Sequence, residues 1–173
     1  MGKKKYVAYV GTYTHGTSKG IQVYDVDVEN GTLTERSEVE VSNASHLAVS
    51  KNGKYLYSIE DEGVAVFERD KNGDLTRLNS VDINGMRGCY LATDVDGRYL
   101  YVAGYHDGKV TVVHTHKDGR LGSVMDGVFH KGLGSVAERN FRPHVNCVRP
   151  TPDNKYLCAV DNGIDQVKIY RIN

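Results

Sequence analysis

The sequence predicts an all-β protein of the β-propeller class, and three observations lead to that prediction. The first is a repeated segment that appears as Tyr55-Leu56-Tyr57, Tyr99-Leu100-Tyr101 and Tyr156-Leu157-Cys158. The second is a tight-turn signal directly before each copy, at residues 52–53, 96–97 and 153–154. The third is the spacing: the first two copies lie 44 residues apart, which is close to the ~40–45 residues of a four-stranded propeller blade.

The first unit of the chain predicts three strands. Residues 6–12 form an apolar run, and a polar loop separates them from residues 21–28, which alternate between apolar and polar side chains as a half-buried strand does. Asn30-Gly31 then turns the chain, and residues 33–41 form the third strand. This unit is the predicted first blade, at about residues 5–42.

The second and third units each predict four strands. In the second blade, at about 44–83, we expect strands at 46–50, 55–60, 64–69 and 75–83. In the third blade, at about 88–128, we expect them at 89–93, 99–104, 110–115 and 121–128. No helical period of 3.6 residues persists anywhere in the chain.

The fourth unit, at about 143–173, predicts three strands at 144–149, 156–161 and 166–172. The chain therefore has about three and a half four-stranded antiparallel blades, whereas a closed ring usually needs about 4–8. The first unit lacks an innermost strand and the last unit lacks an outermost one. We interpret the 173 residues as a single partial propeller domain, the N-terminal half of a seven-bladed ring.

Composition excludes several classes of partner. Lys plus Arg and Asp plus Glu both number 22, so there is no basic field to attract nucleic acid or an anionic membrane. No apolar run is long enough for a membrane helix and no secretory leader is recognisable. The odd number of cysteines, Cys89, Cys147 and Cys158, within apolar strand patterns predicts free, mostly buried thiols and a cytoplasmic protein.

The two faces of the predicted propeller differ in their connections. Turns between the first and second and between the third and fourth strands of a blade are tight, so we expect that face only to close hairpins. The other face carries longer polar loops, including Tyr105 and Asp161, and a long join that contains His130, Arg139, Arg142 and His144. Polar loops on a rigid scaffold commonly carry binding and catalytic groups, so we place the site there.

His144 is the main candidate for catalysis. It begins an innermost strand, and it points to the same side as Asn146 because the two lie two residues apart. A histidine that lines the channel can act as a general acid or base, and a histidine satisfied by backbone groups is the alternative. Arg139 and Arg142 could bind a phosphate or carboxylate, or could be solvated loop residues.

No metal or other cofactor is predicted. His114 and His116 share a strand face, but no third ligand is apparent, so we interpret them as residues of an exposed strand. The acidic turn segments lack the glutamate and helical setting of a calcium loop.

Several separated segments resemble the seven-bladed propeller lactonases of the 6-phosphogluconolactonase type. The opening run at residues 9–14, the repeat at 96–103 and the segment Pro143-His144-Val145-Asn146 carry the likeness, together with residues 161–165. The resemblance covers essentially the whole chain but only about half of a typical member. It implies hydrolysis of a sugar lactone, with His144 at a position that relatives use in the active site, and with further arginine and glutamate residues from later blades.

On this basis we expect His144 as the acid or base, and Arg139, Asn146, Tyr105 and Asp161 as substrate-binding residues near the channel. The expected substrate is a small sugar lactone. Three alternatives stay open: a muconate-lactonizing activity known from fungal relatives, a non-catalytic propeller that binds sugars or proteins, and an inactive truncated fragment. Because a half ring has open edges, we also expect marginal stability, weak activity, and self-association or a second chain that completes the ring.

Overall fold

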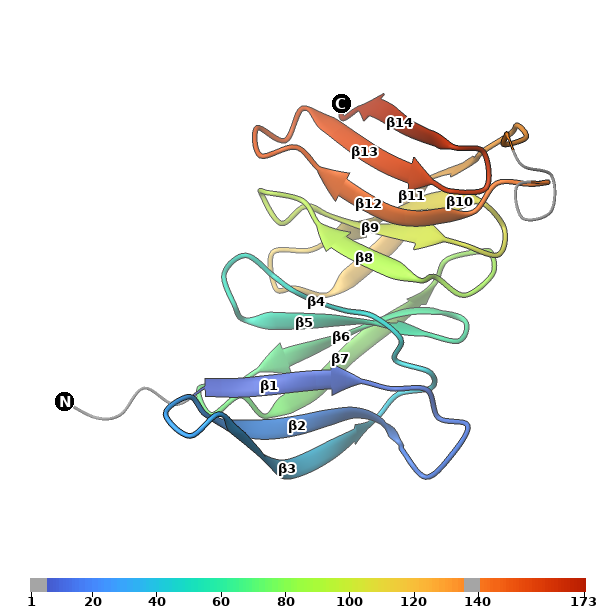
Figure 1. Ribbon diagram of the computed structural model, residues 1–173. Coiled ribbons are helices and arrows are strands. Elements are labelled where there is room, and N and C mark those ends of the chain that lie inside the picture. The colour runs from blue at the N-terminus through green and yellow to red at the C-terminus, as the bar shows by residue number, and fades with distance from the viewer. Residues whose placement is uncertain (1–5, 136–140) are drawn as a thin grey trace.

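The computed structural model describes residues 6–135 and 141–173, which form four antiparallel sheets with 14 strands. The sheets are stacked in chain order, from β1–β3 at the bottom of Figure 1 to β12–β14 at the top. No described residue is helical, and none belongs to a helix that could cross a membrane. The predicted all-β propeller architecture is therefore confirmed.

The strands follow one another as antiparallel neighbours within each sheet. The first sheet contains β1 (Tyr6–Gly11), β2 (Gly20–Asp27) and β3 (Thr32–Glu40). The second contains β4 (Leu47–Val49), β5 (Tyr55–Glu60), β6 (Gly63–Arg69) and β7 (Leu75–Asp82). The third contains β8 (Tyr90–Thr93), β9 (Tyr99–Gly104), β10 (Lys109–Thr115) and β11 (Leu121–Phe129). The fourth contains β12 (Val145–Pro150), β13 (Tyr156–Asp161) and β14 (Gln166–Arg171).

Three apolar layers hold the four sheets together, one at each junction. In β5, Leu56 packs toward the first sheet and Tyr57 toward the third, because successive side chains of a strand point to opposite faces. The two central sheets are therefore covered on both sides, and β6 and β9 are buried almost throughout. Each such side chain contributes about 1.5–3 kcal/mol when it is fully buried.

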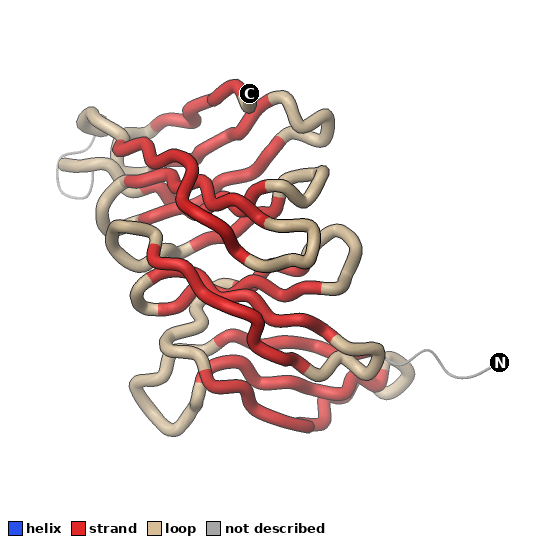
Figure 2. The backbone as a smooth tube through the Cα atoms, turned by 180° about the vertical axis from the view of Figure 1, so that it is seen from behind, coloured by secondary structure: helices blue, strands red, loops and turns tan. Residues whose placement is uncertain are grey.

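Glycine and asparagine close the hairpins between the first two strands of the second, third and fourth sheets. Gly53 and Gly97 have φ angles of 72° and 71°, in the left-handed region that favours glycine. In the fourth sheet Asn154 takes the corresponding conformation, with a φ angle of 57°. These turns lie on the left of Figure 1, and the longer loops lie on the right. Figure 2 shows the same arrangement from behind, with loops joining successive strands at both edges of the stack.

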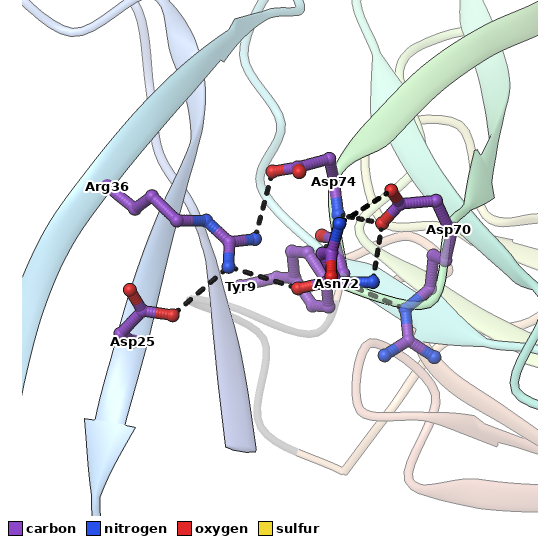
Figure 3. Close-up of polar contacts among 8 residues, drawn as sticks. Tyr9, Asp25, Arg36, Asp70, Asn72 and Asp74 are labelled. Atoms are coloured by element: carbon purple, nitrogen blue, oxygen red, sulfur yellow. Dashed lines mark hydrogen bonds and ion pairs between the residues drawn. The ribbon is translucent and has the colours of Figure 1, made fainter. Parts of the chain in front are cut away.

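A polar contact fastens the first sheet to the turn between β6 and β7. Arg36 lies 3.0 Å from Asp25 and 3.0 Å from Asp74, and it donates a hydrogen bond to the backbone oxygen of Asn72 (Figure 3). Tyr9 donates a 2.6 Å hydrogen bond to the backbone oxygen of Gly73 in the same turn. The side of the stack with tight turns therefore also carries contacts between sheets.

The three cysteines lie within or next to the strands, as we predicted. All three are free, and each is partly exposed. Burial raises the pKa of the Cys89 thiol to about 11, so this group stays protonated near neutral pH. The expectation of free thiols with mostly buried side chains is therefore confirmed.

Candidate active site

One position of the repeat joins neighbouring sheets on the face with the long loops. It lies twelve residues before each repeat tyrosine, and it is occupied by Asn43, Arg87 and His144. Each of these residues contacts the loop that follows the second strand of the preceding blade. We call this the bridge position.

Asn43 and Arg87 use their polar groups for bridging. The side-chain oxygen of Asn43 accepts a 2.9 Å hydrogen bond from the backbone nitrogen of Thr14, and its nitrogen donates to Asp61 at 2.8 Å. Arg87 lies 3.0 Å from Asp61 and covers the ring of Tyr13, 5.1 Å from its centroid. The hydrogen bond from Asn43, followed by the contact with Arg87, lowers the pKa of Asp61.

His144 makes the same bridge with only one of its two ring nitrogens. Its Nδ1 lies 2.8 Å from the backbone oxygen of Tyr105, and a carbonyl oxygen can only accept, so Nδ1 carries the proton. The imidazole stacks on the Tyr105 ring at 4.3 Å between centroids. Nε2 is then an acceptor, and no described residue donates a hydrogen bond to it. With 6% of the residue exposed, His144 sits in a shielded position.

The loop between β13 and β14 approaches His144 closely because residue 163 is a glycine. A Cβ atom at Gly163 would lie 2.1 Å from the backbone oxygen of Arg142 and 2.7 Å from the backbone nitrogen of His144. Contacts below about 3.0 Å are not tolerated against backbone atoms. The absence of a side chain at Gly163 therefore lets this loop pack behind the imidazole.

A buried network supports the backbone of His144. Asp161 Oδ1 accepts hydrogen bonds from the backbone nitrogens of His144 at 2.7 Å and Gly163 at 3.0 Å. Its Oδ2 lies 2.7 Å from His130 Nδ1, and His130 Nε2 lies 2.8 Å from the hydroxyl of Tyr170. Burial lowers the pKa of His130, and the hydrogen bond with Asp161 opposes that shift.

This network changes the interpretation of Asp161. We predicted that it binds substrate, but it is only 1% exposed and both carboxylate oxygens already have partners in the protein. Its geometry is that of a residue that positions the backbone at His144. Tyr170 was not predicted, because its partner His130 comes from a different sheet and the sequence carries no sign of that pairing.

The other predicted site residues lie at different depths. Tyr105 contacts His144 directly and is partly buried, as expected for a residue at the site. Asn146 is exposed, and a register shift between Val145 and Cys147 interrupts the alternation on which its shared side with His144 was based. Arg139 lies outside the described residues.

Comparison with known proteins identifies the family. Residues 7–173 match the family model described as "Lactonase, 7-bladed beta-propeller". The chain belongs to this family. A 6-phosphogluconolactonase from Bacillus subtilis is 39% identical over 174 residues, which cover 97% of this chain and 50% of that protein.

Solved structures of lactonases from this family superpose closely on the chain. A periplasmic gluconolactonase from Pseudomonas aeruginosa is 31% identical, with a TM-score of 0.90 over 97% of this chain and 50% of its own. A structure from Bacteroides fragilis, described as a candidate 6-phosphogluconolactonase, is 38% identical, with a TM-score of 0.91 over 99% of this chain and 49% of its own. The chain thus spans about half the length of the relatives it matches.

Proposed function

We propose that this chain carries the acid–base part of a lactone hydrolase that opens a sugar lactone. The observation that supports this most directly is the imidazole of His144, whose Nδ1 is held by the Tyr105 carbonyl while Nε2 has no partner among the described residues. The names of the lactonase relatives support a sugar lactone as the substrate class, and 6-phosphogluconolactone is the substrate we propose.

In the proposed reaction, a water molecule attacks the lactone carbonyl carbon while Nε2 of His144 accepts its proton. The ring C–O bond of the resulting tetrahedral intermediate then breaks, and the imidazolium returns the proton to the leaving alkoxide oxygen. The product is a single open-chain acid that carries the new hydroxyl group. The hydrogen bond to Tyr105 and the ring stacking keep the imidazole in one tautomer and one orientation throughout.

The remaining site residues have supporting roles in this proposal. Asp161, His130 and Tyr170 position the backbone at His144, and Tyr105 and Asn146 contact the substrate. Arg142, which is exposed close to His144, and Arg139 would attract an anionic group of the lactone or stabilise the oxyanion. The reaction scheme uses no metal or cofactor. The four sheets act as consecutive blades of one domain, with the bounds predicted from the sequence.

A lactone assay tests the proposal. Hydrolysis of 6-phosphogluconolactone would be followed by base uptake for the chain alone, and for the chain joined to the part of the Bacillus subtilis relative that it does not match. We expect turnover above the buffer rate in the joined protein, and its loss on replacing His144 with Ala. A joined protein that folds and still turns over the lactone without His144 would exclude this mechanism.

We propose a cytoplasmic location, which rests on the three free thiols alone. The periplasmic relative from Pseudomonas aeruginosa shows that family membership does not decide the compartment. Fractionation of cells that express the protein would test this part of the proposal.

We also propose that the chain self-associates through its two outermost sheets. Val167 and Ile169 of β14 are exposed, as are Val10 and Leu33 of the first sheet. Apolar side chains on open sheets favour association. Light scattering should show species larger than a monomer, and the double change of Val167 and Ile169 to Thr should shift them toward monomer. A monomer at every concentration would refute the proposal.

A further inference from the structure

A cavity of about 650 Å³ lies between the second and third sheets, at the ends of the strands that carry the tight turns. We call it the turn-face cavity. Its floor and walls come from both sheets, including the turns at residues 50–52, 95–98 and 117–119. We expected these turns only to close hairpins, whereas they also line a cavity between two sheets.

We propose that the turn-face cavity is a second small-molecule site, which binds an aromatic ring that bears an anionic group, a carboxylate or a phosphate. Its volume falls within the ~300–1,000 Å³ that is typical of small-molecule sites. It lies at the turns before β5 and β9, whereas His144 contacts the loop after β9 at the other end of that strand, and every residue that lines the cavity comes from two neighbouring sheets of this chain.

Aromatic side chains form the apolar wall of the cavity. Tyr99 and His114 are 6.3 Å apart between ring centroids, and His114 and His116 are 4.7 Å apart in an edge-on arrangement. Tyr55 and Tyr57 line the opposite side. Because aromatic pairs at such separations attract one another beyond simple burial, a flat ring is the ligand shape that this wall favours.

The inner end of the cavity is held rigid by hydrogen bonds to the turns. Tyr57 donates to the backbone oxygen of Gly119 at 3.3 Å, and Thr115 donates to the backbone oxygen of Gly97 at 2.7 Å. Burial raises the pKa of Tyr57 to about 12, so its phenol keeps the proton that it donates. These two hydrogen bonds join the inner end of the cavity to the turns that line it.

Charged groups of both signs surround the rim. Lys51, Arg98, Lys117 and Asp96 line the cavity. Beside them, Asp94 lies 3.6 Å from Arg98 and Asp118 lies 3.5 Å from Arg120. Asp96 lies 3.5 Å from Arg98, so its charge is already partly balanced within the protein. The two lysines remain to attract an anion at the mouth, with the aromatic wall below it.

Phenyl phosphate, benzoate, inorganic phosphate and benzyl alcohol are the probes that test this proposal. Each would be titrated into the 173-residue chain, with binding followed by the amide NMR signals of Gly97 and Gly119. We expect phenyl phosphate or benzoate to bind at least about tenfold more tightly than inorganic phosphate or benzyl alcohol. Which of the two anionic rings binds better would distinguish a phosphate ligand from a carboxylate ligand.

Matched variants locate the binding. Lys117→Gln should weaken the binding of the preferred probe about threefold, and His116→Ala should weaken it by removing part of the aromatic wall. Lys71 occupies the corresponding turn of the second sheet and does not line the cavity, so Lys71→Gln should leave the affinity unchanged.

The proposal is wrong if inorganic phosphate binds as tightly as the aromatic anions, because the site would then recognise charge alone. It is also wrong if neither aromatic anion shifts the Gly97 and Gly119 signals, or if Lys71→Gln weakens binding as much as Lys117→Gln.

Discussion

The junction between the second and third sheets and the junction between the third and fourth sheets use the same bridge position in different ways. Between the second and third sheets, Arg87 pairs with Asp61, and the contact is largely open to solvent. Between the third and fourth sheets, His144 forms a hydrogen bond with the Tyr105 carbonyl in a shielded setting. The backbone frame is shared, so the side chain alone makes the difference between a structural contact and a candidate catalytic group.

The comparison shows what an imidazole adds to a bridge. A guanidinium has donors only, and an amide at this position uses its oxygen and nitrogen to hold two loops, as Asn43 does. An imidazole can donate from one nitrogen and keep the other as an acceptor. His144 can therefore join two blades and accept a proton from a water molecule at the same time.

The largest expected effect comes from replacing His144 with Asn, the residue at the first bridge position. The amide can still donate to the Tyr105 carbonyl but offers no ring nitrogen as a base. In the joined protein we expect turnover to fall by about 10²–10⁴-fold, while the free energy of unfolding changes by no more than about 1 kcal/mol. Arg87→Asn is the matched control, and its turnover should stay within about twofold of the original. Equal losses in both variants would contradict the distinction between the junctions.

The carboxylates of Asp161 and Asp61, which contact the residues at the bridge position or their backbone, should differ in how much they contribute to stability. Asp161→Ala leaves two backbone donors and His130 without their buried acceptor, so we expect the free energy of unfolding to fall by about 3 kcal/mol. Asp61 is 48% exposed on its side chain, and Asp61→Ala should cost no more than about 1 kcal/mol. Urea unfolding of the two variants measures both values. Similar losses would mean that burial does not separate the two junctions.

The third prediction concerns pH and follows from the buried histidines. Burial lowers the pKa of His130 and of His46. At a pH just below the ordinary histidine pKa of about 6.5, the folded chain therefore binds fewer protons than the unfolded chain. Stability is therefore highest above that pH, and it should fall as the pH is lowered through about 6.5. Urea unfolding at pH 7.5 and 5.5 should show a smaller loss for His130→Gln than for the original chain. A loss of the same size would remove His130 as a cause.

The smallest effect is expected at Arg87 itself. Arg87→Gln removes the ion pair with Asp61 but leaves the hydrogen bonds between Asn43 and Asp61 in place. An exposed ion pair is worth about 0–1 kcal/mol, so the midpoint of urea unfolding should move only slightly, and less at high salt. A loss above about 2 kcal/mol would show that this bridge holds the sheets together more firmly than its exposure indicates.

The fold was predictable because its signals are local. Asn52-Gly53 and Asp96-Gly97 mark hairpins within a few residues of the strands that they join, and alternating runs such as residues 64–69 show their strand character directly. His144 was found in the same way, through the segment that follows Pro143 and the likeness of that segment to a known family. These features do not depend on which distant residues meet.

The parts that could not be predicted depend on contacts between blades. His130 and Tyr170 lie 40 residues apart and meet only when the third and fourth sheets pack together. The role of Asp161 could not be assigned from its place in a loop, because the sequence does not show that both of its oxygens are occupied. The turn-face cavity is lined by residues of two sheets, so no single repeat reveals it.

The shared bridge position suggests how a repeated blade can acquire a catalytic histidine. When a blade is duplicated, the bridge is copied with it, and the codons for asparagine and histidine differ by a single base, as do some codons for arginine and histidine. A mutation of that kind keeps a polar side chain that contacts the preceding blade and adds a ring nitrogen that can accept a proton. A lineage could therefore gain a catalytic base at one junction in a single genetic step, without first passing through an unfolded intermediate protein.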